Sequence, residues 1–221
     1  MSTVTPNPPT GTGTGTDAGA GTGKAKVADT GAAGTAKASP RDRLLDAAAE
    51  LFYRDGVGTG IDALCKAAGV SKRSMYQLFT SKDEVLAAAL DKQGPGLAEL
   101  LLPPPGRPAA PRARMLHVFE RLEEVALAPD YRGCPYLATQ VELKNPGHPA
   151  SLVAARAKQR LTDFFRAEAE QGGAADPDLL ARRLTLVYDG ASARAGIKAD
   201  TLEGLAVTTA AALIDTAGVA A

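Results

Sequence analysis

From Ser39 onward, apolar residues recur at spacings of three and four, which places them along one face of an α-helix. The first helix is expected to begin after Ser39, whose hydroxyl suits a helix cap, with Pro40 in its first turn, and to end at Gly56. Its inward face comprises Leu44, Leu45, Ala48, Leu51 and Phe52. This segment is therefore predicted to be an amphipathic helix packed on a core.

Three further helices are expected at short intervals along the chain. Their ranges are about 60–68, about 72–79 and from 82 onward. Thr59 with Asp62, and Ser81 with Glu84, have the spacing of a capping box, and Gly69 is expected to end the second helix in the left-handed conformation. Short helices separated by tight turns predict a small N-terminal unit.

Pro95 and the proline run 103–105 interrupt the helical pattern, which then resumes. The later helices are expected over about 112–128, from 135 to a stop at 145–147, and over 149–171, 178–197 and 201–217. The helix over 149–171 is expected to pack through Leu152, Ala155, Leu161, Phe164 and Phe165. No alternation of β-branched residues appears between turns, so the fold class is predicted to be all-α, with a larger helical bundle after the N-terminal unit.

Residues 1–38 differ in composition from the rest of the chain. Of these 38 residues 28 are Gly, Thr, Ala or Pro, and none is aromatic, Leu or Ile, so a disordered tail is expected. The stretch ending in Lys24 is not a phosphate-binding loop, because Ala18 and Ala25 stand where Gly and Ser or Thr are needed. The chain is divided into this tail and two predicted units, residues 39–92 and 93–221.

Charge and composition narrow the possible classes of protein. The 25 basic and 25 acidic residues cancel, so no overall positive charge indicates a nucleic-acid partner. Two cysteines cannot form a disulfide framework, which favours a reducing compartment. No apolar run is long enough for a membrane span and the first residues lack a secretory signal. A cytoplasmic protein without a membrane partner is expected.

Residues that could carry catalytic or metal chemistry are few. No Ser/His/Asp, Cys/His or paired-carboxylate set occurs in a recognisable context, so neither an enzyme nor a cofactor is expected. His117 and His148 are isolated, so no metal site is predicted. Cys65 is expected to pack as a small apolar residue. Cys134 precedes a predicted helix and follows Arg132, two features that lower a thiol pKa, so a redox-sensing role stays open beside a structural one.

The turn at 68–71 joins the second and third helices in the manner of a helix-turn-helix motif. Met75 and Phe79, four residues apart, are expected on the buried face of the third helix. Its outward side chains are Lys72, Arg73, Ser74, Tyr76 and Gln77. The window from Lys66 to Lys82 contains basic residues and no acidic one. Such side chains at a helix N-terminus suit DNA phosphates and base edges; an ordinary solvated face is the alternative.

The stretch 69–84, which reads GVSKRSMYQLFTSKDE, resembles the signature of TetR-type bacterial transcriptional repressors. Earlier positions that also fit are Leu51, Phe52, Gly56, Thr59, Ile61 and the run 66–68. The resemblance covers about residues 41–92. It implies an all-α homodimer with an N-terminal domain for double-stranded DNA and a C-terminal domain for dimerisation and a small-molecule effector.

The resemblance also assigns individual residues to DNA. These residues are Thr59, Lys72, Arg73, Ser74, Tyr76, Gln77 and Lys82. Tyr76 and Lys82 would clasp backbone phosphates, and the other residues of the third helix would lie in the major groove. Two positions depart from the family pattern. Gly60 replaces a usual hydroxyl residue, which removes one phosphate contact, and Leu78 replaces a polar or aromatic residue, so it contacts a thymine methyl or simply packs.

The larger bundle is expected to contain the effector cavity and the dimer interface. The candidate cavity residues are Met115, Phe119, Leu122, Tyr136, Phe164 and Tyr188. Their spacing fits plain core equally well. The resemblance suggests a four-helix dimer interface formed by the last two helices of each protomer. The seam residues expected there are Ala181, Leu184, Ala191, Ala195, Leu205, Ala211 and Leu213.

Taken together, the sequence predicts a sequence-specific DNA-binding transcriptional regulator. The resemblance implies a repressor that a small molecule releases from a palindromic operator, with the fourth helix as the lever between the two domains. A transcriptional activator without small-molecule control and a helical protein-interaction adaptor are the alternatives.

Overall fold

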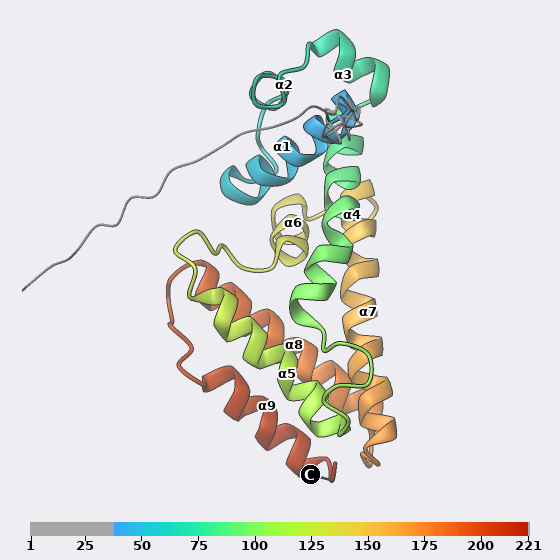
Figure 1. Ribbon diagram of the computed structural model, residues 1–221, viewed down its shortest axis with the longest axis vertical. Helices are drawn as coiled ribbons and strands as arrows, with labels where there is room; N and C mark the ends of the chain where they lie inside the picture. Colours follow the sequence, from blue (N-terminus) through green and yellow to red (C-terminus); the bar gives the residue numbers. More distant parts are fainter. Residues whose placement is uncertain (1–37, 221) are drawn as a thin grey trace, which may run out of the picture. The chain divides into compact units, whose positions relative to one another are not determined.

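The computed structural model describes residues 38–220, which contain nine α-helices and no β-strand (Figure 1). The helices are α1 (Pro40–Asp55), α2 (Ile61–Ala68), α3 (Lys72–Leu78), α4 (Lys82–Leu101), α5 (Pro111–Ala126), α6 (Pro135–Leu143), α7 (Pro149–Gln171), α8 (Pro177–Gly196) and α9 (Leu205–Thr216). The all-α prediction is therefore confirmed. The expected tail, Ala38 excepted, and its Gly-rich stretch lie outside the described residues.

Serine side chains cap three of the N-terminal helices, as predicted. The Oγ atoms of Ser39, Ser71 and Ser81 accept hydrogen bonds from backbone N–H groups three residues later, at 3.0, 3.0 and 3.1 Å. The capping box expected at Thr59 is wrong. Gly60 is the N-cap of α2, and the Thr59 hydroxyl instead donates to the carbonyl of Gly56 at 2.9 Å, which closes the preceding turn.

Pro95 does not interrupt α4, contrary to the sequence prediction. The helix continues through Gly94, Pro95 and Gly96 to Leu101. Proline removes one N–H from the hydrogen-bond ladder, but α4 packs against α1 and α7, and these contacts hold its helical path. Figure 1 shows α4 and α7 side by side over much of their length.

The N-terminal helices share one core with the first turns of α4. Leu44, Leu64, Met75 and Val85 are fully buried there, one from each of α1 to α4. Each such side chain contributes about 1.5–3 kcal/mol through removal of apolar surface from water. The buried positions of α1 are those predicted from its spacing, and α3 is fixed through Met75 with Phe79 just beyond its end.

Helices α5, α7, α8 and α9 pack together at the other end of the described chain (Figure 1). Phe119 of α5 and Phe165 of α7 stack there with ring centroids 5.7 Å apart. The predicted inward face of α7 is partly wrong, because Leu152 and Ala155 are exposed while Val153 and Ala154 are buried. Helix α7 packs against α4 and α6, and this packing buries Val153 and Ala154 in place of Leu152 and Ala155.

The dimer seam predicted from Ala and Leu content also needs correction. Ala181, Leu184 and Ala195 are buried inside the protomer, so they cannot form a surface between two chains. Helix α9 begins at Leu205 rather than 201, because the segment ahead of it turns through left-handed residues. No helix within residues 38–220 is long and apolar enough to cross a bilayer.

Candidate functional site

The turn between α2 and α3 has the geometry expected of a helix-turn-helix motif. Gly69 adopts the left-handed conformation, with φ 62° and ψ 40°, and the Val70 N–H donates to the carbonyl of Cys65 at 3.0 Å. Arg43 of α1 adds a bond that the sequence did not reveal, because its Nε donates to the carbonyl of Ala68 at 3.2 Å. The turn is thus held both from within and from α1.

Helix α3 turns its polar side chains away from the core. Met75 and Phe79 are buried, as predicted, whereas Arg73 and Gln77 are exposed and the Tyr76 side chain is 53% exposed. Ser74 is half-buried, and its Oγ lies 2.9 Å from that of Ser71 at the helix cap. The exposed face therefore presents an aromatic ring, a guanidinium and an amide next to each other.

Two of the predicted DNA-contacting cations already have partners within the chain. Lys72 forms an ion pair with Asp62 of α2 at 2.7 Å, and this contact raises the pKa of Lys72. The Nζ of Lys82 donates to the carbonyl of Val57 at 2.8 Å. The acid-free window in the sequence did not reveal Asp62, which folding brings next to α3. A DNA phosphate that binds Lys72 or Lys82 would therefore compete with Asp62 or with the Val57 carbonyl.

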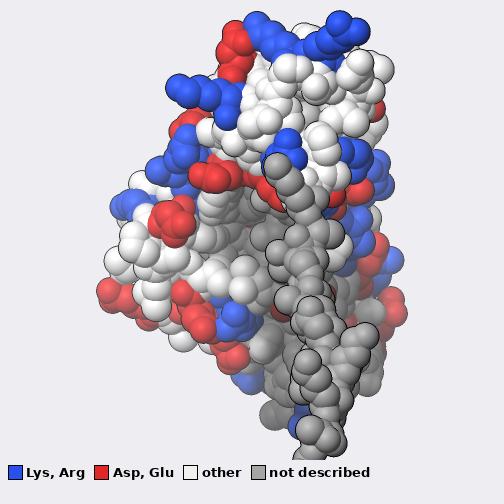
Figure 2. Space-filling model, turned by 45° about the horizontal axis from the view of Figure 1, so that its top comes forward, with Lys and Arg blue, Asp and Glu red and all other residues white. Residues whose placement is uncertain are grey.

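Thr59 lies in the turn that precedes α2, and Lys82, the first residue of α4, reaches the same turn through its bond to the Val57 carbonyl. The Thr59 hydroxyl is occupied by the Gly56 carbonyl, so Thr59 is half-buried and not directed outward like Tyr76. Glu142 of α6 holds the same turn from the other side, because its Oε2 accepts the Val57 N–H at 2.8 Å. Figure 2 shows Lys and Arg side chains at the end of the molecule that carries α2 and α3, with acidic and uncharged groups between them.

Two cavities lie among the helices behind this face. The first measures about 150 Å³ and is bordered by α4, α6, α7 and α8; the second measures about 200 Å³ and adjoins α1, α4, α5 and α8. Leu97, Leu101, Cys134 and Tyr188 line both of them. Cavities of this kind, largely apolar with a few polar groups, are the usual form of small-molecule sites.

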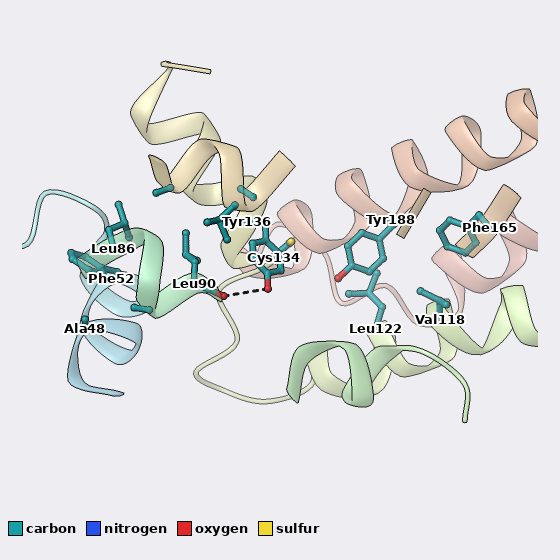
Figure 3. Close-up of a cluster of buried hydrophobic side chains, with 14 of the residues drawn as sticks. Ala48, Phe52, Leu86, Leu90, Val118, Leu122, Cys134, Tyr136, Phe165 and Tyr188 are labelled. Carbon is teal, nitrogen blue, oxygen red and sulfur yellow. Dashed lines mark hydrogen bonds between the residues drawn. The ribbon is translucent and has the colours of Figure 1, made fainter. Parts of the chain in front are cut away.

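The structure distributes the six predicted cavity residues unequally. Tyr136 lines the first cavity, Leu122 the second and Tyr188 both. Figure 3 shows Tyr188 close to Leu122, and the Tyr136 hydroxyl bonded to the carbonyl of Leu90. Met115 and Phe119 are fully buried and Phe164 packs beside Phe165; the three line neither cavity. Burial raises the pKa of Tyr188 well above its ordinary value.

The segment 131–134 connects the second cavity to α1. The hydroxyl of Tyr53 accepts the N–H of Arg132 at 2.8 Å and donates to the carbonyl of Gly133 at 3.2 Å. On its other side this segment touches α8 so closely that a Cβ at Gly196 would lie 2.5 Å from the Arg132 backbone. Sequence reasoning missed Tyr53 because its partners lie about 80 residues away along the chain.

The remaining candidate residues are the two cysteines and His148. Cys65 is buried in α2, which raises the pKa of its thiol, and Cys134 is the buried N-cap of α6. His148 caps α7 through its Nδ1, and its Nε2 lies 3.3 Å from Asp83 of α4. Within residues 38–220, no group of three His, Cys, Asp or Glu side chains could hold a metal ion.

Comparison with known proteins gives consistent results. The family model described as bacterial regulatory proteins, tetR family, matches residues 44–89, which span α1 to the middle of α4. No curated protein matched the chain. The match covers the helices that form the exposed polar face and its supporting core.

Solved structures extend the similarity to nearly the whole described chain. A protein from Streptomyces avermitilis assigned to the TetR transcriptional regulators is 62% identical over 83% of this chain and 100% of its own, with a TM-score of 0.81. A TetR-family regulator from Streptomyces coelicolor is 26% identical over 80% and 93%, with a TM-score of 0.70. Escherichia coli NemR in its reduced form, 21% identical over 82% and 98%, shares the fold with a TM-score of 0.67.

Proposed function

Because the chain belongs to the TetR family of bacterial transcriptional regulators, we propose that it is a cytoplasmic homodimeric repressor that a small molecule releases from a palindromic operator. As a member of this family it is a DNA-binding regulator of transcription. The observation that best supports the proposed contacts is the outward face of α3, where Arg73, Tyr76 and Gln77 are exposed above a buried Met75.

The chemistry of these side chains suits two kinds of DNA contact. The Arg73 guanidinium and the Gln77 amide can each form paired hydrogen bonds to a base edge in the major groove. Tyr76 and Lys82 are suited to phosphate oxygens, which fix the position of the helix but carry no sequence information. Ser74 and Lys72 lie on the same surface, and Lys72 brings its partner Asp62 with it, whereas Thr59 reaches a phosphate only if its hydroxyl leaves the carbonyl of Gly56.

Dimerisation is supported by an exposed apolar stripe on the last two helices. Leu179 and Leu186 of α8 and Ile197 at its C-cap follow a spacing of one helix face, and the latter two are 73% and 76% exposed. On α9, Leu205 is also exposed, and the hydroxyls of three threonines bond back to carbonyls of that helix or of its N-cap. The α9 surface therefore presents methyl groups rather than free hydroxyls.

In the proposed mechanism, two α3 helices must be about 34–36 Å apart to enter successive major grooves of B-DNA. A ligand in the cavities releases the protein only if it binds more tightly to an arrangement with a different separation. The contact of Tyr53 with segment 131–134 offers one physical connection, because that segment borders the second cavity and Tyr53 belongs to α1. The α4 helix offers another, because it borders both cavities and begins beside α3.

Selection from randomised duplex DNA by the full chain, followed by footprinting, tests the DNA-binding part of this proposal. A palindromic consensus is expected. Lys82→Met should then weaken binding to all fragments alike and reduce the slope of log affinity against log salt by about 1, because one phosphate contact is lost. Indifference to every duplex at low salt would refute the proposal, whereas salt-insensitive capture of a protein would favour an adaptor.

A second experiment tests the dimer surface. Leu186→Glu should shift the sedimentation-equilibrium mass from dimer to monomer, because it places a charge in the apolar stripe. Leu152→Glu, at an exposed leucine of α7, is the matched control and should leave the dimer intact. Dimers that persist in Leu186→Glu would refute this interface. In-vitro transcription from the selected site would show whether the bound dimer represses or activates.

A further inference from the structure

The first cavity has an apolar interior and a polar rim. Its interior is formed by Leu97, Leu101, Leu102, Ala157 and Leu161. Two cations line its rim, Lys158 and Arg160, both from α7. A cavity of about 150 Å³ accommodates a benzene ring. The interior thus fits the apolar body of a small molecule, and the rim determines what its polar end must be.

One of the two rim cations is already neutralised. Lys158 pairs with Asp189 of α8, and its Nζ lies 4.6 Å above the centre of the Tyr188 ring. Its side chain is only 14% exposed, so an incoming group would have to displace a mostly buried ion pair. Opening that pair would leave Asp189 without its partner, which is costly in a desolvated site. Lys158 therefore lines the cavity without being available to bind the charged end of a ligand.

Arg160 differs from Lys158 in having no internal partner. Within residues 38–220, no carboxylate lies within ion-pair distance of its guanidinium. Burial raises the pKa of Tyr136, and Cys134 and Asp91 raise it further. Arg160 lowers this pKa, which shows that the guanidinium charge acts on the Tyr136 hydroxyl. The cavity rim consequently carries one positive charge, on the exposed Arg160, that forms no ion pair within the described residues and lies next to a tyrosine hydroxyl.

Gly94 of α4 makes room for these two polar groups to converge. A Cβ at position 94 would lie 3.4 Å from Tyr136 Oη and 3.9 Å from Arg160 Nη2. The bond that Tyr136 makes to the carbonyl of Leu90 is 3.5 Å long, at the outer limit for a hydrogen bond, so the hydroxyl can donate to a better acceptor. A planar guanidinium and a hydroxyl that face one point suit a carboxylate group.

Building on the proposed effector-controlled function, we infer that the first cavity takes a small amphiphilic monocarboxylate, with its apolar body among the leucines and its carboxylate between Arg160 and Tyr136. A single free positive charge matches a monoanion, whereas a phosphate dianion would keep an uncompensated charge at the rim. A cationic ligand would face the positive charge of Arg160.

Direct binding of simple probes to the full chain, without DNA, tests this inference by calorimetry. The probes are 3-phenylpropanoate, 3-phenylpropan-1-ol and 3-phenylpropylamine, which share one apolar body and differ in the charge at one end. The carboxylate should bind about tenfold more tightly than the alcohol, because a charge-assisted hydrogen bond replaces a neutral one, and the amine should bind most weakly.

Arg160→Gln locates the charge that recognises the carboxylate. It should weaken 3-phenylpropanoate about tenfold and leave the alcohol within about twofold. Arg156→Gln, an exposed arginine one turn earlier on α7 that lines neither cavity, is the matched control and should change neither affinity. Ala157→Leu fills the interior and should weaken both probes alike, with helix content checked by circular dichroism.

Three results would overturn the inference: no binding of any probe at millimolar concentration, equal affinity for carboxylate and alcohol, or an Arg160→Gln variant that still prefers the carboxylate. These outcomes are separate from failure of the proposed function, because none of them involves DNA. A protein that binds and releases its operator normally but ignores the carboxylate would retain the function and lose this assignment.

Discussion

The Tyr53 hydroxyl provides a sensitive test of how α1 is attached to the helices around the cavities. It accepts the N–H of Arg132 at 2.8 Å and donates to the carbonyl of Gly133 at 3.2 Å, so one side-chain atom satisfies two backbone groups of the segment 131–134. Tyr53→Phe removes this atom and leaves the ring in place. The change therefore isolates two hydrogen bonds from the packing of the aromatic ring.

The expected loss of stability follows from what each backbone group can do without the hydroxyl. A polar group left buried without a partner costs about 1–3 kcal/mol, whereas a group that water can reach costs much less. The Arg132 N–H is near solvent, and the Gly133 carbonyl is partly buried. We therefore expect Tyr53→Phe to lower the free energy of unfolding by about 1–2 kcal/mol.

Urea denaturation at fixed protein concentration measures this loss as a lower midpoint with an unchanged slope. Tyr76→Phe is the matched control, because its hydroxyl is on the exposed face of α3; its free energy of unfolding should stay within about 0.5 kcal/mol of the parent value. DNA affinity should respond in the opposite order, falling for Tyr76→Phe and not for Tyr53→Phe. Equal midpoints for the two variants would show that the Tyr53 bonds do not stabilise the fold.

Three further changes test other parts of the structure. Gly196→Ala should destabilise by about 1–3 kcal/mol in urea titrations, because its Cβ would lie 2.5 Å from the Arg132 backbone, whereas Gly96→Ala, with open space around it, should be neutral or stabilising. Gln77→Ala should relax base preference at one operator position in a selection experiment; an unchanged consensus would exclude Gln77 as a base reader. Burial keeps Tyr188 neutral in the folded state, and its folded pKa exceeds its unfolded pKa. Its stabilising contribution is complete below pH 10 and falls above it by up to about 1.4 kcal/mol per pH unit, a slope that Tyr188→Phe should remove from urea midpoints measured between about pH 8.5 and 11.

Local signals in the sequence predicted local structure well. The serine caps, the left-handed Gly69 and the buried pair Met75 and Phe79 all depend on residues within one or two turns, so spacing alone identifies them. Pro95 was misleading because proline disfavours a helix locally, while the packing of α4 against two other helices sustains it. Propensity is a weak guide where tertiary contacts oppose it.

Features that depend on distant residues could not be predicted. Spacing on α7 predicted an inward Leu152, whereas the burial of Val153 instead depends on where α4 and α6 lie. Abundant alanine and leucine on α8 indicated close packing but not whether it faced the same chain or a second one. That Arg160 forms no ion pair could not be predicted, because this depends on where folding places the carboxylates of the described residues.

The composition of α4 has a mechanical consequence. At Pro95 the helix lacks an N–H that would otherwise bond to the carbonyl of Asp91, and the glycines on either side add no side chain that could stiffen it. We therefore expect the helix to bend most easily around Pro95, in its C-terminal half and beside the first cavity. A ligand that displaces Gly94 or Leu97 acts close to this bend. The N-terminal end of α4, which follows α3 in the chain, would then move farther than the displaced residues.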